Sequence, residues 1–315
     1  MIRRLIREMI CILLLLASTI CAGQAEVYID QEKPADWEER DLLRIYALYA
    51  LDCDSFVLEC GGQSMLLDGG NGPKRKDLVD FLKEHGWEHP DIIFSSHPHD
   101  DHLEAVYNAL KLEQITTDVF MSPFPENYWA YGILDLQRKT ARVLQNREIP
   151  FRQVFNGDEL ILGAAEMTVY RYDGDTKKPD GRGMDVNDMS AVLHVRFGEC
   201  AILLTADIGG TIQKMLAADY GSGKLKSDIL KAPHHGKTAV NTDLLKAVDP
   251  KLVIMTGKVN RTEECLKQLN GAGIAWKRTS YGSIVMETDG KDWYVNQAYS
   301  SEQVKKQEKQ EKKRK

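Results

Sequence analysis

Residues 95–105 read SSHPHDDHLEA, and five of the six positions from His97 to His102 carry a histidine or an aspartate. The whole chain has only eight histidines in 315 residues, so three in one short turn form an unusual concentration. Imidazole and carboxylate groups are the usual protein ligands of zinc and of its first-row neighbours. His97 and His99 point to the same side of an extended segment, and Asp101 and His102 follow at the start of a helix. The pattern H-x-H-x-D-H therefore predicts a metal site, against the alternative of a surface cluster without a ligand.

Four residues from one turn cannot complete the coordination of two metal ions, so further ligands have to come from other segments. Asp207 follows an apolar strand, and His234 and His235 follow another. An aspartate after a strand more often caps the next helix, which here would begin near Thr211. Together with the histidine-rich turn, however, these residues predict a shared metal centre built from several strand ends.

The segments that must position these groups alternate between β-rich and helical runs. Apolar, β-rich runs predict strands over Leu43–Ala50, Ser55–Glu59, Ser64–Leu67, Asp91–Ser96, Ser190–Phe197, Cys200–Thr205, Asp228–Ala232 and Leu252–Met255. Apolar residues at helical spacing predict helices over Asp77–His85, Leu103–Leu112, Asp243–Val248 and Thr262–Leu269. A meander of strands followed by alternating strands and helices is typical of a layered α/β sandwich. We predict a single domain over residues 26–300.

The two ends of the chain differ from this domain. Three arginines precede the apolar run Met9–Ile20, and residues 1–25 resemble a secretory signal that is cut before Glu26. An uncleaved anchor is the alternative, although the run is shorter than the roughly 20 residues that span a bilayer. Residues 301–315 hold seven Lys or Arg and three Glu, which predicts a disordered tail that could contact an anionic surface. We therefore expect an exported protein, either secreted or on the outer face of the cell membrane.

The domain between these ends is acidic. Residues 26–300 hold 31 basic and 43 acidic side chains, a net charge of −12. Such a charge disfavours binding to long nucleic acids, whose affinity for proteins comes largely from the phosphates. DNA is therefore a disfavoured partner unless basic residues gather locally.

Four cysteines lie in this domain: Cys53, Cys60, Cys200 and Cys265. Cys53 and Cys60 fall on one predicted strand, too far apart along it for a disulfide. No pair has the CxxC spacing of a zinc knuckle, so we expect buried free thiols.

Four segments resemble the sequence marks of the metallo-β-lactamase superfamily. They are MLLDGG (65–70), HPHDDH (97–102), LTAD (204–207) and KAPHHG (231–236). The last two, together with NDMS (187–190) and RTSYGSI (278–284), are similar to the branch that contains the C-terminal hydrolase domain of the competence protein ComEC. The resemblance covers residues 40–297 and implies a four-layer αββα sandwich with a two-metal site.

The resemblance also implies which residues bind metal. His97 and His99 would bind the first ion, and Asp101 and His102 would bind the second. Asp207 would bridge both ions. We expect one or two divalent ions, with zinc in first place and manganese as the alternative.

Three more residues receive roles from the resemblance. One member of the pair His234 and His235 would complete the second metal site, and the other would face the substrate. The sequence leaves open which is which. Asp68 is implied as a residue that orients a ligand and does not itself bind metal.

Some positions depart from the family pattern. The superfamily often has a further histidine on the first metal, but the only histidine in the corresponding stretch is His194, which is predicted to lie within a strand. Asn187, Asp188 or water could then fill that position. Leu51–Asp54 and Val259–Thr262 replace family segments near the substrate, so these departures affect the substrate more than the fold.

These features predict an exported metal-dependent hydrolase, whose catalytic residues would be Asp101, Asp207, His234 and His235. The expected reaction is cleavage of a phosphodiester in a small or polymeric anionic substrate by a metal-bound hydroxide. We expect no stable protein partner. One alternative is a hydrolase of a lactone, a β-lactam or another ester or amide, and another is a catalytically silent binding protein.

Overall fold

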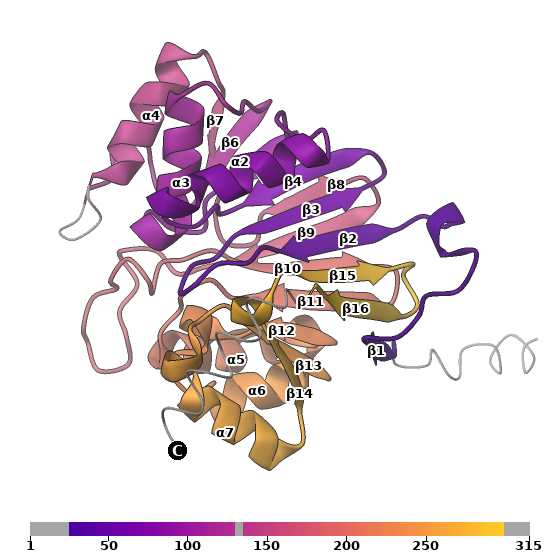
Figure 1. Ribbon diagram of the computed structural model, residues 1–315. Coiled ribbons are helices and arrows are strands. Elements are labelled where there is room, and N and C mark those ends of the chain that lie inside the picture. The colour runs from indigo at the N-terminus through magenta and orange to yellow at the C-terminus, as the bar shows by residue number, and fades with distance from the viewer. Residues whose placement is uncertain (1–24, 130–134, 299–315) are drawn as a thin grey trace, which may run out of the picture.

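A computed structural model of the protein describes residues 25–129 and 135–298. Two β-sheets pack face to face, and helices cover the outer face of each sheet (Figure 1). The predicted signal, apart from Ala25, and the predicted tail lie outside the described residues. Within the described ranges, no helix combines the length and the apolar character that crossing a membrane requires.

The first sheet has nine strands in the order β1-β16-β15-β2-β3-β4-β5-β6-β7. Their bounds are β1 Val27–Ile29, β2 Leu43–Ala47, β3 Phe56–Cys60, β4 Gln63–Leu67, β5 Ile92–Phe94, β6 Val119–Ser122, β7 Phe151–Gln153, β15 Ile284–Thr288 and β16 Trp293–Gln297. The central strands are antiparallel, whereas β4, β5, β6 and β7 run parallel.

The second sheet has seven strands in the order β14-β13-β12-β11-β10-β9-β8. Their bounds are β8 Glu159–Leu162, β9 Ala165–Tyr170, β10 Val192–Phe197, β11 Cys200–Leu204, β12 Ile229–Lys231, β13 Leu252–Met255 and β14 Ala275–Arg278. Here β8 to β11 are antiparallel neighbours, and β11 to β14 run parallel.

Each parallel set is connected by helices, because parallel neighbours need a crossover connection. The helices are α2 Arg75–Glu84, α3 Asp100–Lys111 and α4 Leu136–Asn146 on the first sheet, and α5 Gly210–Leu225, α6 Thr242–Val248 and α7 Glu263–Ala272 on the second. Short 3₁₀ turns lie at Trp37–Glu39, Gly72–Lys74, Pro233–Gly236, Val259–Arg261 and Thr279–Tyr281. Figure 1 shows the two helical groups on opposite sides of the paired sheets.

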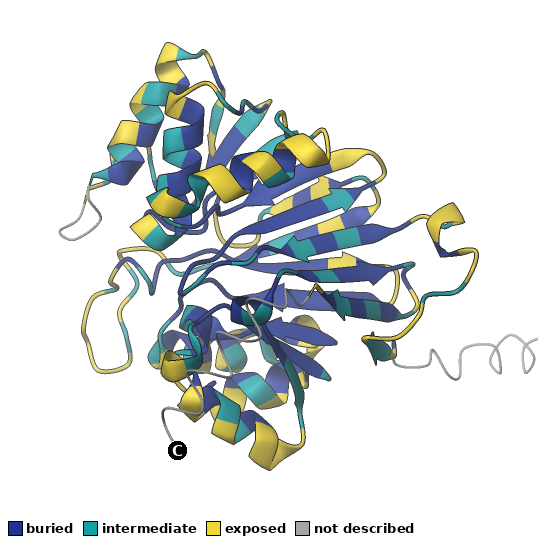
Figure 2. Ribbon diagram, viewed as in Figure 1, coloured by how far each residue is buried: buried dark blue, intermediate teal, exposed yellow. Residues whose placement is uncertain are grey.

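Apolar side chains fill three layers. The inner faces of the sheets share one core, which includes Ile45, Leu67, Leu193 and Ile254. A second core lies between the first sheet and its helices, and a third lies between the second sheet and its helices. Figure 2 shows the same pattern, with buried strands between helices that are exposed on one side. The predicted αββα sandwich is therefore confirmed.

The predicted strands and helices all exist, but several bounds differ. The strand predicted to reach Ala50 ends at Ala47, and Cys53 lies in the loop that follows, outside the strand that ends at Cys60. Leu48 continues the apolar run past the end of the strand, because it is buried in the core that lies beneath α2. All four cysteines are buried and free, as expected. β1, β6 to β9, β14 to β16 and α4 had no separate prediction.

Candidate metal centre

The carboxyl ends of the parallel strands bring the predicted residues together. Asp68 follows β4 and His97 lies shortly after β5, while Asp207 follows β11 and the pair His234 and His235 follows β12. Parallel neighbours end at the same edge of a sheet, so each sheet contributes its side chains at one edge. The two sheets meet there, and segments far apart in sequence form one cluster.

The turn after β5 places its ligand groups through the start of α3. His99 precedes the first helical residue, with extended backbone angles. Asp101 and His102 lie in the first helical turn, and His102 is fully buried. The helix therefore sends Asp101 and His102 back toward the histidines of the turn.

His102 lies between two carboxylates. Its Nδ1 is 2.7 Å from Asp68 Oδ2, and its Nε2 is 3.4 Å from Asp207 Oδ1. Ser96 donates to Asp68 through its backbone N–H (2.8 Å) and its hydroxyl group (2.6 Å). Asp68 is thereby fixed as the partner of Nδ1, which leaves Nε2 directed at the centre of the cluster.

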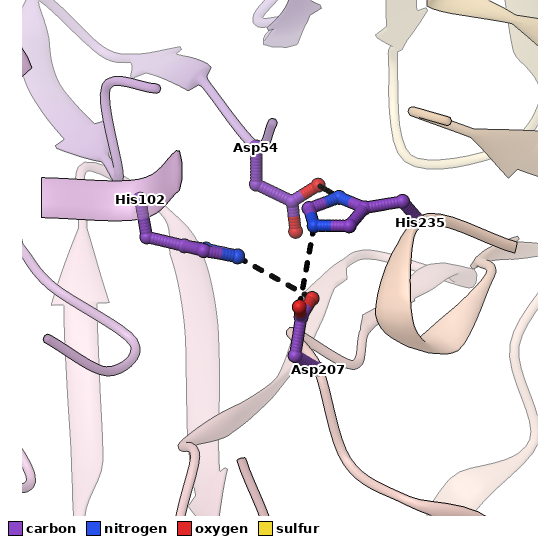
Figure 3. Close-up of side chains that lie close together, drawn as sticks. All are labelled: Asp54, His102, Asp207 and His235. Atoms are coloured by element: carbon purple, nitrogen blue, oxygen red, sulfur yellow. Dashed lines mark hydrogen bonds and ion pairs between the residues drawn. The ribbon is translucent and has the colours of Figure 1, made fainter. Parts of the chain in front are cut away.

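His235 has the same arrangement with a different aspartate. Its Nδ1 is 3.0 Å from Asp54 Oδ1 and 2.9 Å from Thr256 Oγ1. Its Nε2 lies 3.2 Å from Asp101 Oδ2 and 3.2 Å from Asp207 Oδ2. Figure 3 shows His102 and His235 on either side of Asp207, with the Asp54 carboxylate next to the ring of His235.

His97 and His99 form the other side of the cluster. His97 Nε2 lies 3.1 Å from His99 Nδ1, and His97 Nδ1 lies 3.1 Å from Ser96 Oγ. The rings of His97 and His102 are 4.0 Å apart between centroids. Three imidazoles from one turn therefore face a common space beside Asp101 and Asp207.

The donor set fits a divalent metal ion. Among the described residues, two groups of three or more side chains have ligand atoms close enough to share an ion: Asp54, His102, Asp207 and His235, and also His97, Asp101 and His102. His102 Nε2 and Asp207 Oδ1 are buried, and neither makes a hydrogen bond. Buried polar atoms are normally hydrogen-bonded, so a bound cation would account for this pair. These buried residues could therefore bind metal ions.

Comparisons with known proteins give matches at the level of structure. No protein-family model and no curated protein sequence matches the chain. The metallo-β-lactamase fold protein YhfI from Bacillus subtilis is 11% identical, with 75% of this chain and 95% of that chain covered and a TM-score of 0.46. A mutant of the CmlA β-hydroxylase from Streptomyces venezuelae is 16% identical, with 82% and 55% covered and a TM-score of 0.50. Unliganded yeast PDE1 is 9% identical, with 82% and 98% covered and a TM-score of 0.49.

The architecture has four layers in the order αββα. A cluster of His and Asp side chains lies where the parallel strands of both sheets end. The chain has the αββα sandwich that the sequence resemblance implies. It spans about half the length of the CmlA β-hydroxylase chain, so the likeness to that protein concerns this fold alone.

Burial and neighbouring carboxylates divide the histidines of this site into two classes. Burial opposes protonation of His102 and His235, but the carboxylates around them raise the pKa of His102 well above its ordinary value and that of His235 to about 10. Burial lowers the pKa of His97 well below its ordinary value, and the charge of His102 adds to this effect. Burial opposes ionisation of Asp207, yet His235 and His102 hold its pKa well below the usual range. These shifts favour the charged forms of His102, His235 and Asp207 and the neutral form of His97.

A buried lysine belongs to the same cluster. Lys231 is the last residue of β12, and its ammonium group forms an ion pair with Asp54 and donates to the Ala206 carbonyl oxygen at 2.7 Å. It also lies 3.5 Å from Asp207 Oδ1. The ammonium therefore offsets part of the negative charge of two aspartates at the back of the site.

His234 and His235 differ in their surroundings. His235 is fully buried, whereas the side chain of His234 is 37% exposed and its Nε2 lies 3.7 Å from Asp207 Oδ2. Both residues have positive φ angles, 50° and 61°, a strained conformation for histidine. Such strain persists where the surroundings enforce it. Here the backbone conformation directs the two adjacent rings differently.

Of the residues considered for the missing ligand, His194 lies away from the cluster. His194 is buried in β10, and its Nε2 contacts the Lys226 carbonyl oxygen at 3.2 Å, outside the cluster. Asp188 pairs with Lys178, while Asn187 has a buried side-chain oxygen without a hydrogen-bond partner. Asp207 does not cap α5, because Gly209 occupies that N-cap position.

Sequence reasoning missed two members of the centre, Asp54 and Lys231. Asp54 lies in the segment Leu51–Asp54, which was noted only as a departure from the family pattern. Lys231 belongs to KAPHHG, and neither the sequence pattern nor the resemblance gives it a role. An aspartate in an otherwise buried loop (Asp54 is 2% exposed) and a lysine ending an apolar strand were the available signals.

Proposed function

We propose that this protein is a metal-dependent hydrolase that cleaves phosphodiesters, with zinc as its ion and manganese as the alternative. The observation that carries the proposal is the convergence of His102 Nε2, His235 Nε2 and the Asp207 carboxylate on one buried point. The preference for phosphodiesters rests on the ComEC-like segments of the sequence.

The proposed ligands form two sets that share Asp207. His97 and His99 belong to the first set. The second set consists of Asp101, His102 and His235, with Asp68 and Asp54 holding the Nδ1 atoms of the two histidines. A histidine that donates its second N–H to a carboxylate is held in one tautomer and becomes a stronger ligand.

Divalent ions in such a site supply a water activated near neutral pH and stabilise the charge that develops on a phosphoryl oxygen. His234 is the side chain that we propose for transferring the remaining proton. It is half-buried beside Asp207, and its pKa is lowered mainly by burial. In our proposal His234 carries a proton to the leaving oxygen, a role that a histidine beside the ligands can perform without binding metal.

The decisive experiment uses protein purified without chelator, and the same protein after metal removal. Both are tested against bis(p-nitrophenyl) phosphate and a chromogenic cephalosporin. We expect hydrolysis of the phosphodiester only, its loss on metal removal and its recovery with zinc or manganese. Cleavage of the cephalosporin alone would favour the lactamase alternative, and bound metal without cleavage of either compound would favour a silent binding protein.

The remaining sequence expectations complete the proposal. We propose that the protein is exported and acts either as a secreted enzyme or at the outer face of the membrane. Its proposed substrate is a small or polymeric anion, with DNA disfavoured, and we propose that it works without a stable protein partner.

A further inference from the structure

The loop that follows β13 lies directly against the metal centre. Thr256 Oγ1 donates to Asp54 Oδ1 at 2.6 Å, and Gly257 N donates to the His235 carbonyl oxygen at 2.9 Å. A Cβ at position 257 would lie only 2.8 Å from that oxygen, so the close approach requires glycine. The next residue, Lys258, is therefore held at a fixed place beside His235.

Asp52, which lies between β2 and β3, anchors this loop through its backbone and its carboxylate. Its backbone N–H donates to the Thr256 carbonyl oxygen at 3.1 Å, and its Oδ1 accepts from Lys258 N at 2.8 Å. Its Oδ2 lies 3.1 Å from Lys258 Nζ and 3.4 Å from Arg261 Nη1. Asp52 has a positive φ of 57° and is two residues from Asp54, so the anchor and the metal centre share one short segment.

Two cationic side chains share the single carboxylate of Asp52, and the exposed Glu263 and Glu264 follow in the first turn of α7. The side chains of Lys258 and Arg261 are 45% and 57% exposed, whereas Asp52 is 9% exposed. Exposed ion pairs of this kind are weak, so an incoming anion can bind the two cations without a large loss.

These two cations are outside the metal-ligand set. The contacts described for Lys258 and Arg261 are with Asp52, whereas Asp54 and Asp207 contact Lys231 and the imidazoles. An anion bound by the cations would thus be a neighbour of the group that reacts and would not be that group itself.

We propose that Lys258 and Arg261 form a second anion site, which binds a phosphate adjacent to the one that is cleaved. This inference rests on the proposed function and narrows its substrate to molecules with consecutive phosphates, such as a short oligonucleotide. The cations supply positive charge locally, within a domain whose net charge is −12 over residues 26–300. A local pair of cations suits a few phosphates, whereas the acidic domain repels a long polyanion.

The test compares two probes that differ by one phosphate, thymidine 3′,5′-bisphosphate and thymidine 5′-phosphate. Their affinities for the zinc-loaded, full-length protein are measured by titration calorimetry. We expect the bisphosphate to bind roughly 5-fold more tightly or better, the gain that one good exposed ion pair provides. Raising the salt concentration should reduce this preference.

Matched variants assign the preference to the loop. Lys258→Met and Arg261→Met should each reduce the preference for the bisphosphate, while the affinity for thymidine 5′-phosphate changes little. Lys251→Met is the control, because Lys251 lies just before the other end of β13 and pairs with Glu26 at 3.5 Å. A thermal melt of each variant shows that it is folded, and Lys258→Gln replaces Lys258→Met if that variant unfolds.

The outcomes separate the two proposals. Equal affinity for both probes, absence of binding, or a preference that survives both loop substitutions would overturn the second anion site. Hydrolysis of bis(p-nitrophenyl) phosphate is measured in the same preparations. A loop-dependent preference without hydrolysis would support the anion site while contradicting the phosphodiesterase.

Discussion

Asp54 Oδ1 lies 3.0 Å from His235 Nδ1, although 181 positions separate the two residues in the chain. The contact fixes the ring of His235 so that Nε2 faces Asp101 and Asp207. It comes from the packing of the β2–β3 loop against the turn after β12, one from each sheet. The two halves of the sandwich therefore build the site jointly.

The first prediction concerns the two aspartates that hold histidines. Asp68→Asn and Asp54→Asn should each lower zinc affinity by roughly 10- to 100-fold, because the amide no longer favours the same tautomer. Competition with a coloured chelator measures the affinity. Asp54→Asn should also destabilise the fold more, since Lys231 then loses its carboxylate.

Asp77→Asn is the matched control for this pair. Asp77 is exposed in α2 and pairs with Lys74 at 2.9 Å. Zinc affinities of Asp54→Asn and Asp68→Asn that equal that of Asp77→Asn would show that these aspartates do not support the ligands.

The second prediction concerns Lys231. Lys231→Met should destabilise the metal-free protein by about 3–5 kcal/mol, the usual cost of leaving a buried charge without its partner. Zinc should restore part of the loss, because a cation beside Asp207 replaces some of the missing positive charge. Urea unfolding with and without zinc measures both effects.

Lys277→Met is the comparison for Lys231→Met. Lys277 is also buried, and it pairs with Asp30 at 2.7 Å in a part of the molecule away from the centre. Its destabilisation should be the same with and without zinc. A loss for Lys231→Met that zinc leaves unchanged would argue against a link between Lys231 and the metal.

Part of this centre could be predicted from sequence because its geometry is local. His97, His99, Asp101 and His102 share one turn, and parallel strands bring Asp207 to the same edge. Asp54 could not be assigned, because its role depends on contacts with His235 and Lys231, which come from distant segments. For the same reason the sequence left open which histidine of the adjacent pair faces inward.

The fold shows the same division between local and distant information. Strands β4, β5, β11, β12 and β13 lie beside helical crossovers, and they were predicted because their apolar runs are continuous and largely buried on both faces. β8 alternates between exposed and buried residues, and β7 is short and only partly buried. Their pairing with neighbouring strands determines them, and a single sequence does not contain that information.

The third prediction concerns export. The mature protein should begin at Glu26, as the arginine-rich start and apolar run of residues 1–25 indicate. Glu26 N lies 2.8 Å from Asp292 Oδ1, so cleavage would turn this hydrogen bond into an ion pair. N-terminal sequencing of protein recovered outside the cytoplasm tests the idea. A full-length chain in the cytosol would contradict it.

The last prediction concerns the unequal histidines. His235→Asn should lose metal and activity together, because His235 is buried with Nε2 directed at Asp101 and Asp207. His234→Asn should keep its metal while turnover falls by roughly 10²- to 10⁴-fold, the usual contribution of a general acid. Asparagine tolerates a positive φ better than most residues, so neither change adds backbone strain.

Asp207→Ala sets the reference for these two variants. Asp207 lies beside His102, His234 and His235, so its removal should abolish metal binding and hydrolysis at once. Elemental analysis and the rate of bis(p-nitrophenyl) phosphate hydrolysis are measured for all three variants. If His234→Asn loses as much metal as His235→Asn, His234 is a ligand and the proton must come from another group. If both histidine variants keep full metal and full rate, the pair is structural, and a binding protein explains the site better than a hydrolase does.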